Sequence, residues 1–169
     1  SLGNRVWFDT NNNGVIDFGT EVGIDGVRVE LYQDNGDGVF GAGDTLLEFD
    51  TTASGGYYRF DNLPPGNYIV VLPADNFRNT GAGDTVPGDP LAGYWSSQTS
   101  ISSTGVISDA TANDPDIDVD DSDDNGISNL TSNILNYVAS NAVTLGPGSS
   151  EPTGETDLSP SGQGNVDNR

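Results

Sequence analysis

The stretch Asp9-Thr10-Asn11-Asn12-Asn13-Gly14-Val15-Ile16-Asp17 carries oxygen-bearing side chains at alternate positions, from Asp9 to Asn13 and again at Asp17. This is the spacing of an EF-hand calcium loop, in which position 6 is a turn glycine and position 7 offers its backbone carbonyl. The bidentate acid expected at position 12 comes one residue late, because Thr20 stands there and Glu21 follows. We predict a calcium loop with a one-residue insertion at its exit. Its ligands would be Asp9, Asn11, Asn13, the carbonyl of Val15, Asp17 and Glu21. The alternative is an Asn/Gly-rich turn that holds no ion.

A second candidate loop runs from Asp34 to Asp44. Taking Gly38 as the turn glycine places Asn35 and Asp37 at ligand positions and Asp44 at the twelfth. Gln33 would then be a poor first ligand, and a shifted register would use Asp34 instead. The pattern therefore proposes Asp34, Asn35, Asp37 and Asp44 as ligands. A tight hairpin turn on Asn35-Gly36, which needs no metal, remains open as the other interpretation.

The third candidate is the acidic segment from residue 109 to residue 126. Alternating aspartates in an extended chain place their carboxylates on one side, where they repel one another unless a cation lies between them. We expect calcium there, shared with the first loop or with Asp89, and two or three ions in all. The candidate ligands are Asp116, Asp118, Asp120, Asp121 and Asp123. The alternative is a solvated acidic loop.

The composition excludes several kinds of chemistry. The chain has 169 residues and a net charge of -21, with no cysteine, histidine or lysine. Disulfides, zinc sites of the common types, His-based catalytic triads and Schiff-base chemistry are therefore absent. Such an acidic chain would repel a phosphate backbone, and no apolar run is long enough to span a membrane, so we expect neither nucleic-acid binding nor membrane insertion. Paired carboxylates in Gly-rich, metal-spaced loops do not suit a glycosidase, and we predict that the chain is not an enzyme.

The apolar residues alternate with polar ones, and 23 glycines and 9 prolines separate the short alternating runs, which predicts strands joined by turns. The strands are expected at 2–8, 27–32, 46–52, 57–60, 68–72, 94–102 and 136–145. The inward side chains would be Val27, Val29, Leu31, Leu47, Phe49, Tyr58, Phe60, Leu63, Tyr68, Val70, Leu72, Val138 and Val143. Trp7, Phe8, Tyr94 and Trp95 are expected mainly in the core, although an aromatic platform for sugars is an alternative.

Several motifs carry a family likeness: Gly3-Asn4-Arg5-Val6-Trp7-Phe8-Asp9, Gly23-Ile24-Asp25-Gly26-Val27, Gly56-Tyr57-Tyr58-Arg59-Phe60 and Gly66-Asn67-Tyr68-Ile69-Val70. They resemble the B-type repeat of serine-aspartate repeat (Sdr) surface proteins and, more widely, the B-type repeats of collagen-binding adhesins. The resemblance implies an all-β fold, an Ig-like or prealbumin-like antiparallel β-sandwich of about seven strands with long calcium-binding loops. It also implies an extracellular, bacterial cell-surface location and a stalk role among tandem repeats. Residues 1–145 would form one domain, and 146–169 an irregular Gly/Pro/Ser-rich tail leading to a missing closing strand or to the next repeat.

Two departures from the family pattern leave alternatives open. The chain lacks the lysine that collagen-adhesin repeats use for an isopeptide bond. It also stops near the point where Sdr repeats begin an apolar closing strand, so that strand could come from an identical subunit. The favoured function is a calcium-stabilised spacer. The alternatives are an adhesive module for a glycan or matrix protein, and a subunit that assembles by strand complementation.

Overall fold

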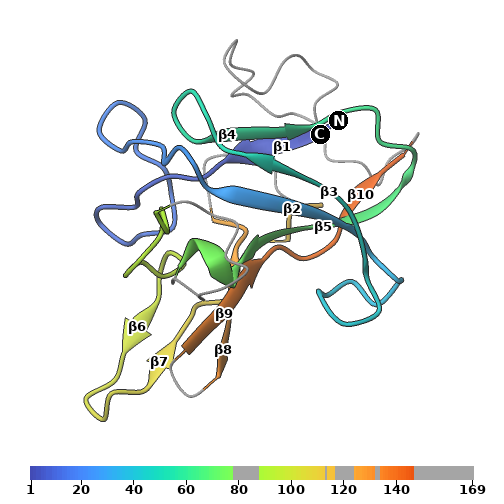
Figure 1. The fold of residues 1–169 in the computed structure, drawn as a ribbon. Coiled ribbons are helices and arrows are strands. Elements are labelled where there is room, and N and C mark those ends of the chain that lie inside the picture. The colour runs from blue at the N-terminus through green and yellow to red at the C-terminus, as the bar shows by residue number, and fades with distance from the viewer. Residues whose placement is uncertain (78–87, 113, 117–123, 132–133, 147–169) are drawn as a thin grey trace.

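The computed structural model of the chain describes residues 1–77, 88–112, 114–116, 124–131 and 134–146 (Figure 1). The elements are β1 (Leu2–Arg5), β2 (Arg28–Gln33), β3 (Thr45–Thr51), β4 (Tyr57–Phe60), β5 (Gly66–Pro73), the 3₁₀ turn η1 (Ala74–Asn76), β6 (Ser100–Ile101), β7 (Ile107–Ser108), β8 (Ile127–Thr131), β9 (Ile134–Ala139) and β10 (Val143–Leu145). The predicted all-β class is confirmed. Of the predicted tail, residues 147–169 lie outside the described part.

The strands form two facing sheets and a small hairpin. The larger sheet has the order β3-β2-β5-β9-β8, with β10 also paired to β5, and the smaller one consists of β1 and β4. All pairings between these strands are antiparallel. Figure 1 shows β1 and β4 lying across β2 and β5, while the β6–β7 hairpin projects away from them. The arrangement agrees with an Ig-like β-sandwich.

The described part contains ten strands where about seven were predicted. One of the three extra strands arises because the single strand predicted at 136–145 is divided into two. β9 and β10 both pair with β5 and are separated by Ser140–Ala142, where the Ser140 N–H still donates to the Val70 carbonyl at 2.9 Å. The other two are β7 and β8, which lie where no strand was predicted. β7 has two residues, and alternation cannot detect a strand that short.

The core lies between the two sheets. The fully buried side chains of Val29, Leu31 and Tyr68 from the larger sheet pack against Leu2 and Phe60 from the smaller one. The period-two alternation of β2 therefore predicts its buried row correctly, since successive residues of a strand point to opposite faces. Val138 and Val143 are also buried as expected.

β5 is buried on both faces, which the sequence did not predict. Ile69 and Val71 point away from the main core and are as inaccessible as Tyr68. They form a second cluster with Ala139, covered by Tyr32, Phe40 and Tyr137. The Phe40 ring meets the rings of Tyr32 and Tyr137 edge-on, at centroid distances of 4.7 and 4.8 Å. β5 is central because it pairs with β2 on one side and with β9 and β10 on the other.

Two strand predictions are wrong. Leu47 and Phe49 of β3 were expected inward, but they are 44% and 56% exposed. β3 is an edge strand that pairs with β2 alone among the described strands, and alternation shows only that two faces differ, not that either is covered. The strand predicted at 94–102 is reduced to β6, because the preceding residues form turns.

Asn76 ties η1 to the larger sheet. Its side chain is fully buried, accepts a hydrogen bond from the Arg28 N–H and donates one to the Arg28 carbonyl, both at 2.8 Å. The amide thus completes the backbone pairing of β2 where no strand continues it.

We expect Asn76→Ala to lower the free energy of unfolding by about 2 kcal/mol, because it leaves two buried backbone groups without partners. Urea unfolding followed by circular dichroism measures this change. Asn67→Ala, which truncates an exposed asparagine of β5, is the matched control and should unfold within about 0.5 kcal/mol of the native chain. Equal midpoints for the native chain and Asn76→Ala would contradict the assigned role of the amide.

No helix in the described ranges has the length and apolar character needed to cross a membrane.

Candidate calcium-binding loops

Loop 1, residues 9–21, curls around the side-chain oxygens that its spacing singled out. The two carboxylate oxygens of Asp9 accept hydrogen bonds from the N–H groups of Asn13 and Gly14, at 3.2 and 2.8 Å. The Asn11 amide donates to Asp17 at 2.9 Å, and the Asn13 side-chain oxygen accepts from the Val15 N–H at 2.8 Å. The structure therefore brings Asp9, Asn11, Asn13 and Asp17 into one loop. Val15 was proposed as a ligand through its backbone carbonyl alone, and its side chain is exposed.

Glu21, rather than Thr20, closes this loop. The Glu21 side chain is buried, and its carboxylate accepts hydrogen bonds from the N–H and hydroxyl of Thr10 and from the N–H of Asp17, at 2.7, 2.8 and 3.1 Å. The Asp17 N–H lowers the pKa of Glu21, burial opposes this, and the Thr10 groups lower it further. The ionised Glu21 carboxylate thus links the start of the loop, at Thr10, to Asp17 near its end. Its side chain points inward, as a one-residue insertion before the closing acid requires.

Gly14 occupies the bend for two reasons. Its φ of +78° lies in the left-handed region that favours glycine. A Cβ at this position would also come within 2.8 Å of the Gln98 side-chain nitrogen. The turn role that the sequence assigned to Gly14 is confirmed, and Gln98 adds a packing reason that lies 84 positions away along the chain.

Loop 1 is held against two segments that are distant in sequence. Gln98 donates from its backbone N–H to the Asn12 side chain at 2.6 Å and from its amide to the Asn13 carbonyl at 2.7 Å. The Asp124 N–H donates to the Gly14 carbonyl at 2.8 Å. The acidic segment therefore contacts loop 1, and the expectation that the two share an ion stays a prediction. Nothing in the local sequence around Gln98 signals this contact.

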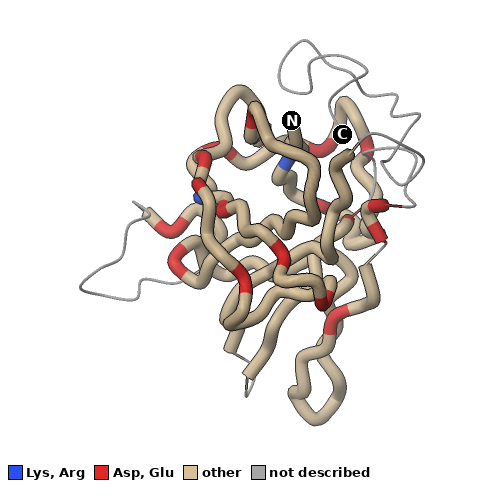
Figure 2. The backbone as a smooth tube through the Cα atoms, turned by 90° about the vertical axis from the view of Figure 1, so that its right-hand side faces the viewer, with Lys and Arg blue, Asp and Glu red and all other residues tan. Residues whose placement is uncertain are grey.

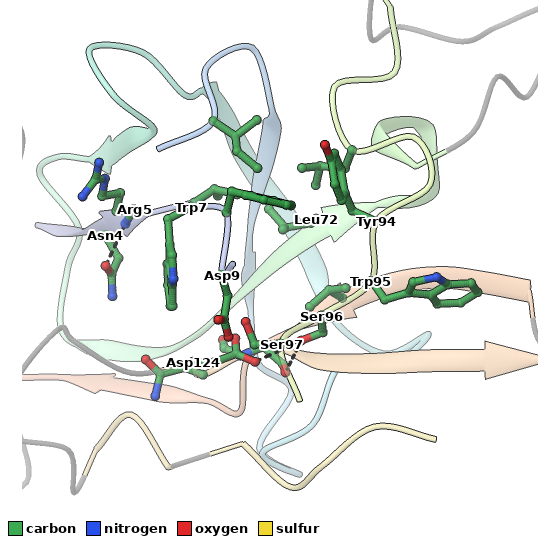
Figure 3. A pocket seen from close by; sticks show the side chains of 18 of the residues that line it. Asn4, Arg5, Trp7, Asp9, Leu72, Tyr94, Trp95, Ser96, Ser97 and Asp124 are labelled. Carbon is green, nitrogen blue, oxygen red and sulfur yellow. Dashed lines mark hydrogen bonds between the residues drawn. The ribbon is translucent and has the colours of Figure 1, made fainter. Parts of the chain in front are cut away.

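Asp124 lies in an environment that disfavours its charged form. Burial raises the pKa of the Asp124 carboxyl to about 7, and the nearby charges of Asp109 and Asp9 add to the rise. The N–H of Gly126 and the hydroxyl of Ser96 donate to this carboxyl at 2.9 and 3.0 Å and partly oppose it. Figure 3 shows the carboxylates of Asp9 and Asp124 close together beside Ser96 and Ser97. A cation placed here would reverse the effect on the pKa, because it favours the ionised form.

Loop 2, residues 34–44, gathers three acidic side chains. One carboxylate oxygen from each of Asp34, Asp37 and Asp44 lies within 4.8 Å of the other two. Asp34 also accepts from the Gly38 N–H at 3.1 Å, and Asp44 accepts from the N–H groups of Asn35 and Gly41 at 3.0 and 2.7 Å. The shifted register that begins at Asp34 is therefore the one the structure forms. Asn35 contributes its backbone N–H to Asp44, and its amide lies 3.5 Å from Asp37.

The alternative of a tight Asn35-Gly36 hairpin turn is wrong. β2 ends at Gln33 and β3 begins at Thr45, so the connection is the whole of loop 2 rather than two residues. Three oxygens of carboxylate type, converging in a long loop, are the ligands that a hard divalent cation prefers.

Asp116 binds β10 through its side chain. Its carboxylate accepts from the N–H and the hydroxyl of Thr144 in β10, at 2.7 and 2.6 Å. The proposed ligands Asp118, Asp120, Asp121 and Asp123 lie outside the described residues. Asp124, which the ligand prediction omitted, is the acid that contacts loop 1, and Asp109 lies near Asp124. Asp109 also accepts from the Ser128 N–H at 2.8 Å.

The fold and its Asx-rich loops define a class of β-sandwich module with candidate calcium-binding turns. The chain matches the profile of the SdrD B-like domain over residues 1–118, and it belongs to that family. The predicted resemblance is confirmed.

The relatives are long proteins from bacteria and from a social amoeba. Over 70 residues, 41% of this chain, it is 49% identical to serine-aspartate repeat-containing protein I of Staphylococcus saprophyticus and 47% identical to fibrinogen-binding protein of Staphylococcus epidermidis. It is 40% identical to Colossin-B of Dictyostelium discoideum over the same share of the chain. The matched segment spans 3%, 6% and 2% of these proteins respectively. No solved structure matches the chain.

Proposed function

We propose that this chain is a calcium-stabilised, non-catalytic spacer module of an extracellular bacterial surface protein. The observation that carries the proposal is the convergence of the Asp34, Asp37 and Asp44 carboxylates in loop 2. Loop 1 supports it with the same chemistry, assembled from Asp9, Asn11, Asn13 and Asp17. Membership of the SdrD B-like family, shared with staphylococcal serine-aspartate repeat proteins, supports a place in a surface protein. The small share of the relatives' length that is matched supports a module combined with others.

The physical reason for calcium is charge. With 26 acidic and 5 basic residues the folded chain repels itself, and neither a disulfide nor an isopeptide bond can offset the repulsion. Figure 2 shows the acidic residues along turns in many parts of the described backbone, with few basic residues among them. Ions that bind only the folded form neutralise these turns and stabilise it by mass action. A module of this kind would be stiff in the millimolar calcium outside cells and looser without it.

Calcium titration calorimetry on chelator-treated protein tests the proposal. We expect two or three ions, with dissociation constants of about 10⁻⁴–10⁻³ M. Asp44→Asn should remove one of them, because it deletes one of the three converging charges of loop 2. Glu48→Gln, an exposed acid in the adjacent β3, removes the same charge outside the loop and should leave the ion count unchanged. Protein that binds no ion, or equal losses in the two variants, would contradict calcium binding in loop 2.

A second function, self-association between copies or neighbouring repeats, is favoured by one observation. The edge strand β3 exposes Leu46 and Leu47, at 46% and 44%, along a sheet edge with unpaired backbone groups in the described part. Such an edge is a template for strand addition.

We expect the protein to form dimers at about 100 μM and Leu47→Lys to shift it to the monomer, because a lysine on an edge strand opposes edge-to-edge pairing. Light scattering after size exclusion measures the mass. Val106→Lys, in the exposed turn between β6 and β7, makes the same change of charge away from this edge and should leave the dimer intact. Monomers in all three samples would exclude the strand edge as a contact at this concentration.

A further inference from the structure

An aromatic cleft opens between loop 1, the smaller sheet and the segment 91–97. Trp7 and Phe8, which follow β1, line it together with Tyr94 and Trp95 from that segment. The rings of Phe8 and Tyr94 meet edge-on at 5.1 Å between centroids. Phe8, Tyr94 and Trp95 are 36%, 45% and 36% exposed, so the expectation that these aromatics fill the core is wrong. Tertiary structure has instead brought Trp7 and Phe8 to the same cleft as Tyr94 and Trp95, which lie 86 or more residues further along the chain. Figure 3 shows the Trp7 and Tyr94 side chains on either side of the cleft, whereas the Trp95 ring points away from Asp9 and Asp124.

One side of the cleft is polar and acidic. Asp9, Asp124, Ser96 and Ser97 line it opposite the rings. Figure 3 shows these four side chains grouped below Trp7 and Tyr94. Carboxylates accept hydrogen bonds and donate none when ionised, so this side favours a ligand that brings donors. The negative charge also disfavours any anionic ligand.

We propose that this cleft binds one pyranose ring of a neutral or amino-bearing glycan. A pyranose has an apolar C–H face that packs on aromatic rings, and its rim of hydroxyl groups can donate hydrogen bonds to the carboxyl oxygens of Asp9 and Asp124. The cleft volume is about 220 Å³. That lies below the roughly 300–1,000 Å³ of sites for drug-sized ligands, which suits one ring rather than several. Glycans that carry carboxylate or sulfate groups are excluded by charge.

This site does not rest on the proposed spacer function, because the aromatic rings on which the sugar would pack are not calcium ligands. Asp9 is shared with loop 1, and the experiment is therefore carried out at constant calcium, with circular dichroism confirming the fold of each sample. If the sugar does not bind, the calcium proposal is unaffected. If calcium does not bind, the sugar proposal is unaffected.

The two tryptophans make the cleft directly observable. The whole chain contains two, Trp7 and Trp95, and both line the cleft. In a ¹⁵N-labelled sample the indole N–H signal of Trp7, whose ring lies beside Asp9, should move and saturate on addition of chitotriose or its deacetylated, cationic form, with a dissociation constant of about 1 mM. Hyaluronan tetrasaccharide, which is acidic, should leave both signals in place.

Tyr94→Ala should weaken the binding of chitotriose by about fivefold or more, because it removes an aromatic face at the mouth of the cleft. Phe49→Ala deletes an exposed aromatic on β3, far from the cleft, and should bind as the native chain does. A Trp7 indole signal that stays fixed at about 10 mM chitotriose would overturn the proposal. Equal binding by Tyr94→Ala, equal shifts with hyaluronan, or shifts with an apolar extended peptide in place of the sugars would also overturn it.

Discussion

Removal of calcium is expected to lower the melting temperature of this module by about 10–15 °C. Each ion that binds the folded form alone adds RT ln(1+[L]/Kd), roughly 1.4–2.7 kcal/mol when free calcium is about 10–100 times Kd. Two ions then contribute about 3–5 kcal/mol, a large part of the roughly 5–15 kcal/mol that stabilises a domain. For a chain of this size each kcal/mol corresponds to about 2–4 °C.

Thermal unfolding in 10 mM calcium chloride and in chelator, followed by circular dichroism, measures this shift. Ionic strength must be matched with sodium chloride, because general screening of a chain with net charge -21 also raises stability. Asp44→Asn should lose about half of the calcium-dependent shift, whereas Glu48→Gln should keep all of it. Identical midpoints with and without calcium would remove the physical basis of the spacer proposal.

Asp124→Asn is expected to have opposite effects in the absence and in the presence of calcium. In chelator at pH 8 it should stabilise the fold by about 2–4 kcal/mol, an upper range set by roughly three pKa units at 1.36 kcal/mol each. The reason is the position of this carboxylate, which is buried close to Asp9 and Asp109. In calcium the same substitution removes a negative charge beside loop 1. The rise in melting temperature that calcium causes should therefore be smaller in this variant.

The pH dependence of Asp124 has a definite sign. Its pKa is raised from 3.8 to about 7, so between these values the folded chain binds more protons than the unfolded one. In chelator, the contribution of Asp124 to the free energy of unfolding should therefore be highest near pH 4 and should fall as the pH rises to 7. Asp124→Asn should flatten that decline.

Melting temperatures of the native chain and the variant from pH 5 to pH 8, in chelator, measure the effect. Asp61→Asn is the control, because Asp61 is an exposed acid that pairs with Arg59 at 3.0 Å. A decline of the same steepness in the native chain and in Asp124→Asn would show that this carboxyl is already ionised at pH 5.

The sequence predicted much of the fold and the local parts of the site. The alternation of β2 identified Val27, Val29 and Leu31 as core residues, and all three are fully buried. The spacing of loop 1 identified the bend at Gly14 and the inward turn of Glu21. These features are encoded within about ten residues, because strand period, turn chemistry and loop ligation are local properties of the chain.

Other features depended on which strands lie at an edge. Leu47 and Phe49 have the same alternation as the buried row of β2, yet they are exposed because β3 has a neighbour on one side only in the described part. Alternation likewise marked one face of β5, whereas pairing with β2 on one side and with β9 and β10 on the other buried both. Burial follows from neighbours in space, which the local pattern does not specify.

The amino-acid sequence by itself determined an all-β chain with acidic, glycine-bent turns suited to a hard cation. The tertiary structure alone decided which distant residues meet. It set Asp124 and Gln98 against loop 1, and it joined Trp7 and Phe8 to Tyr94 and Trp95 in one cleft. The physical reason is range: a turn needs only its own residues to satisfy backbone and ligand geometry, whereas a buried charge or a cleft exists only where separate segments exclude water together.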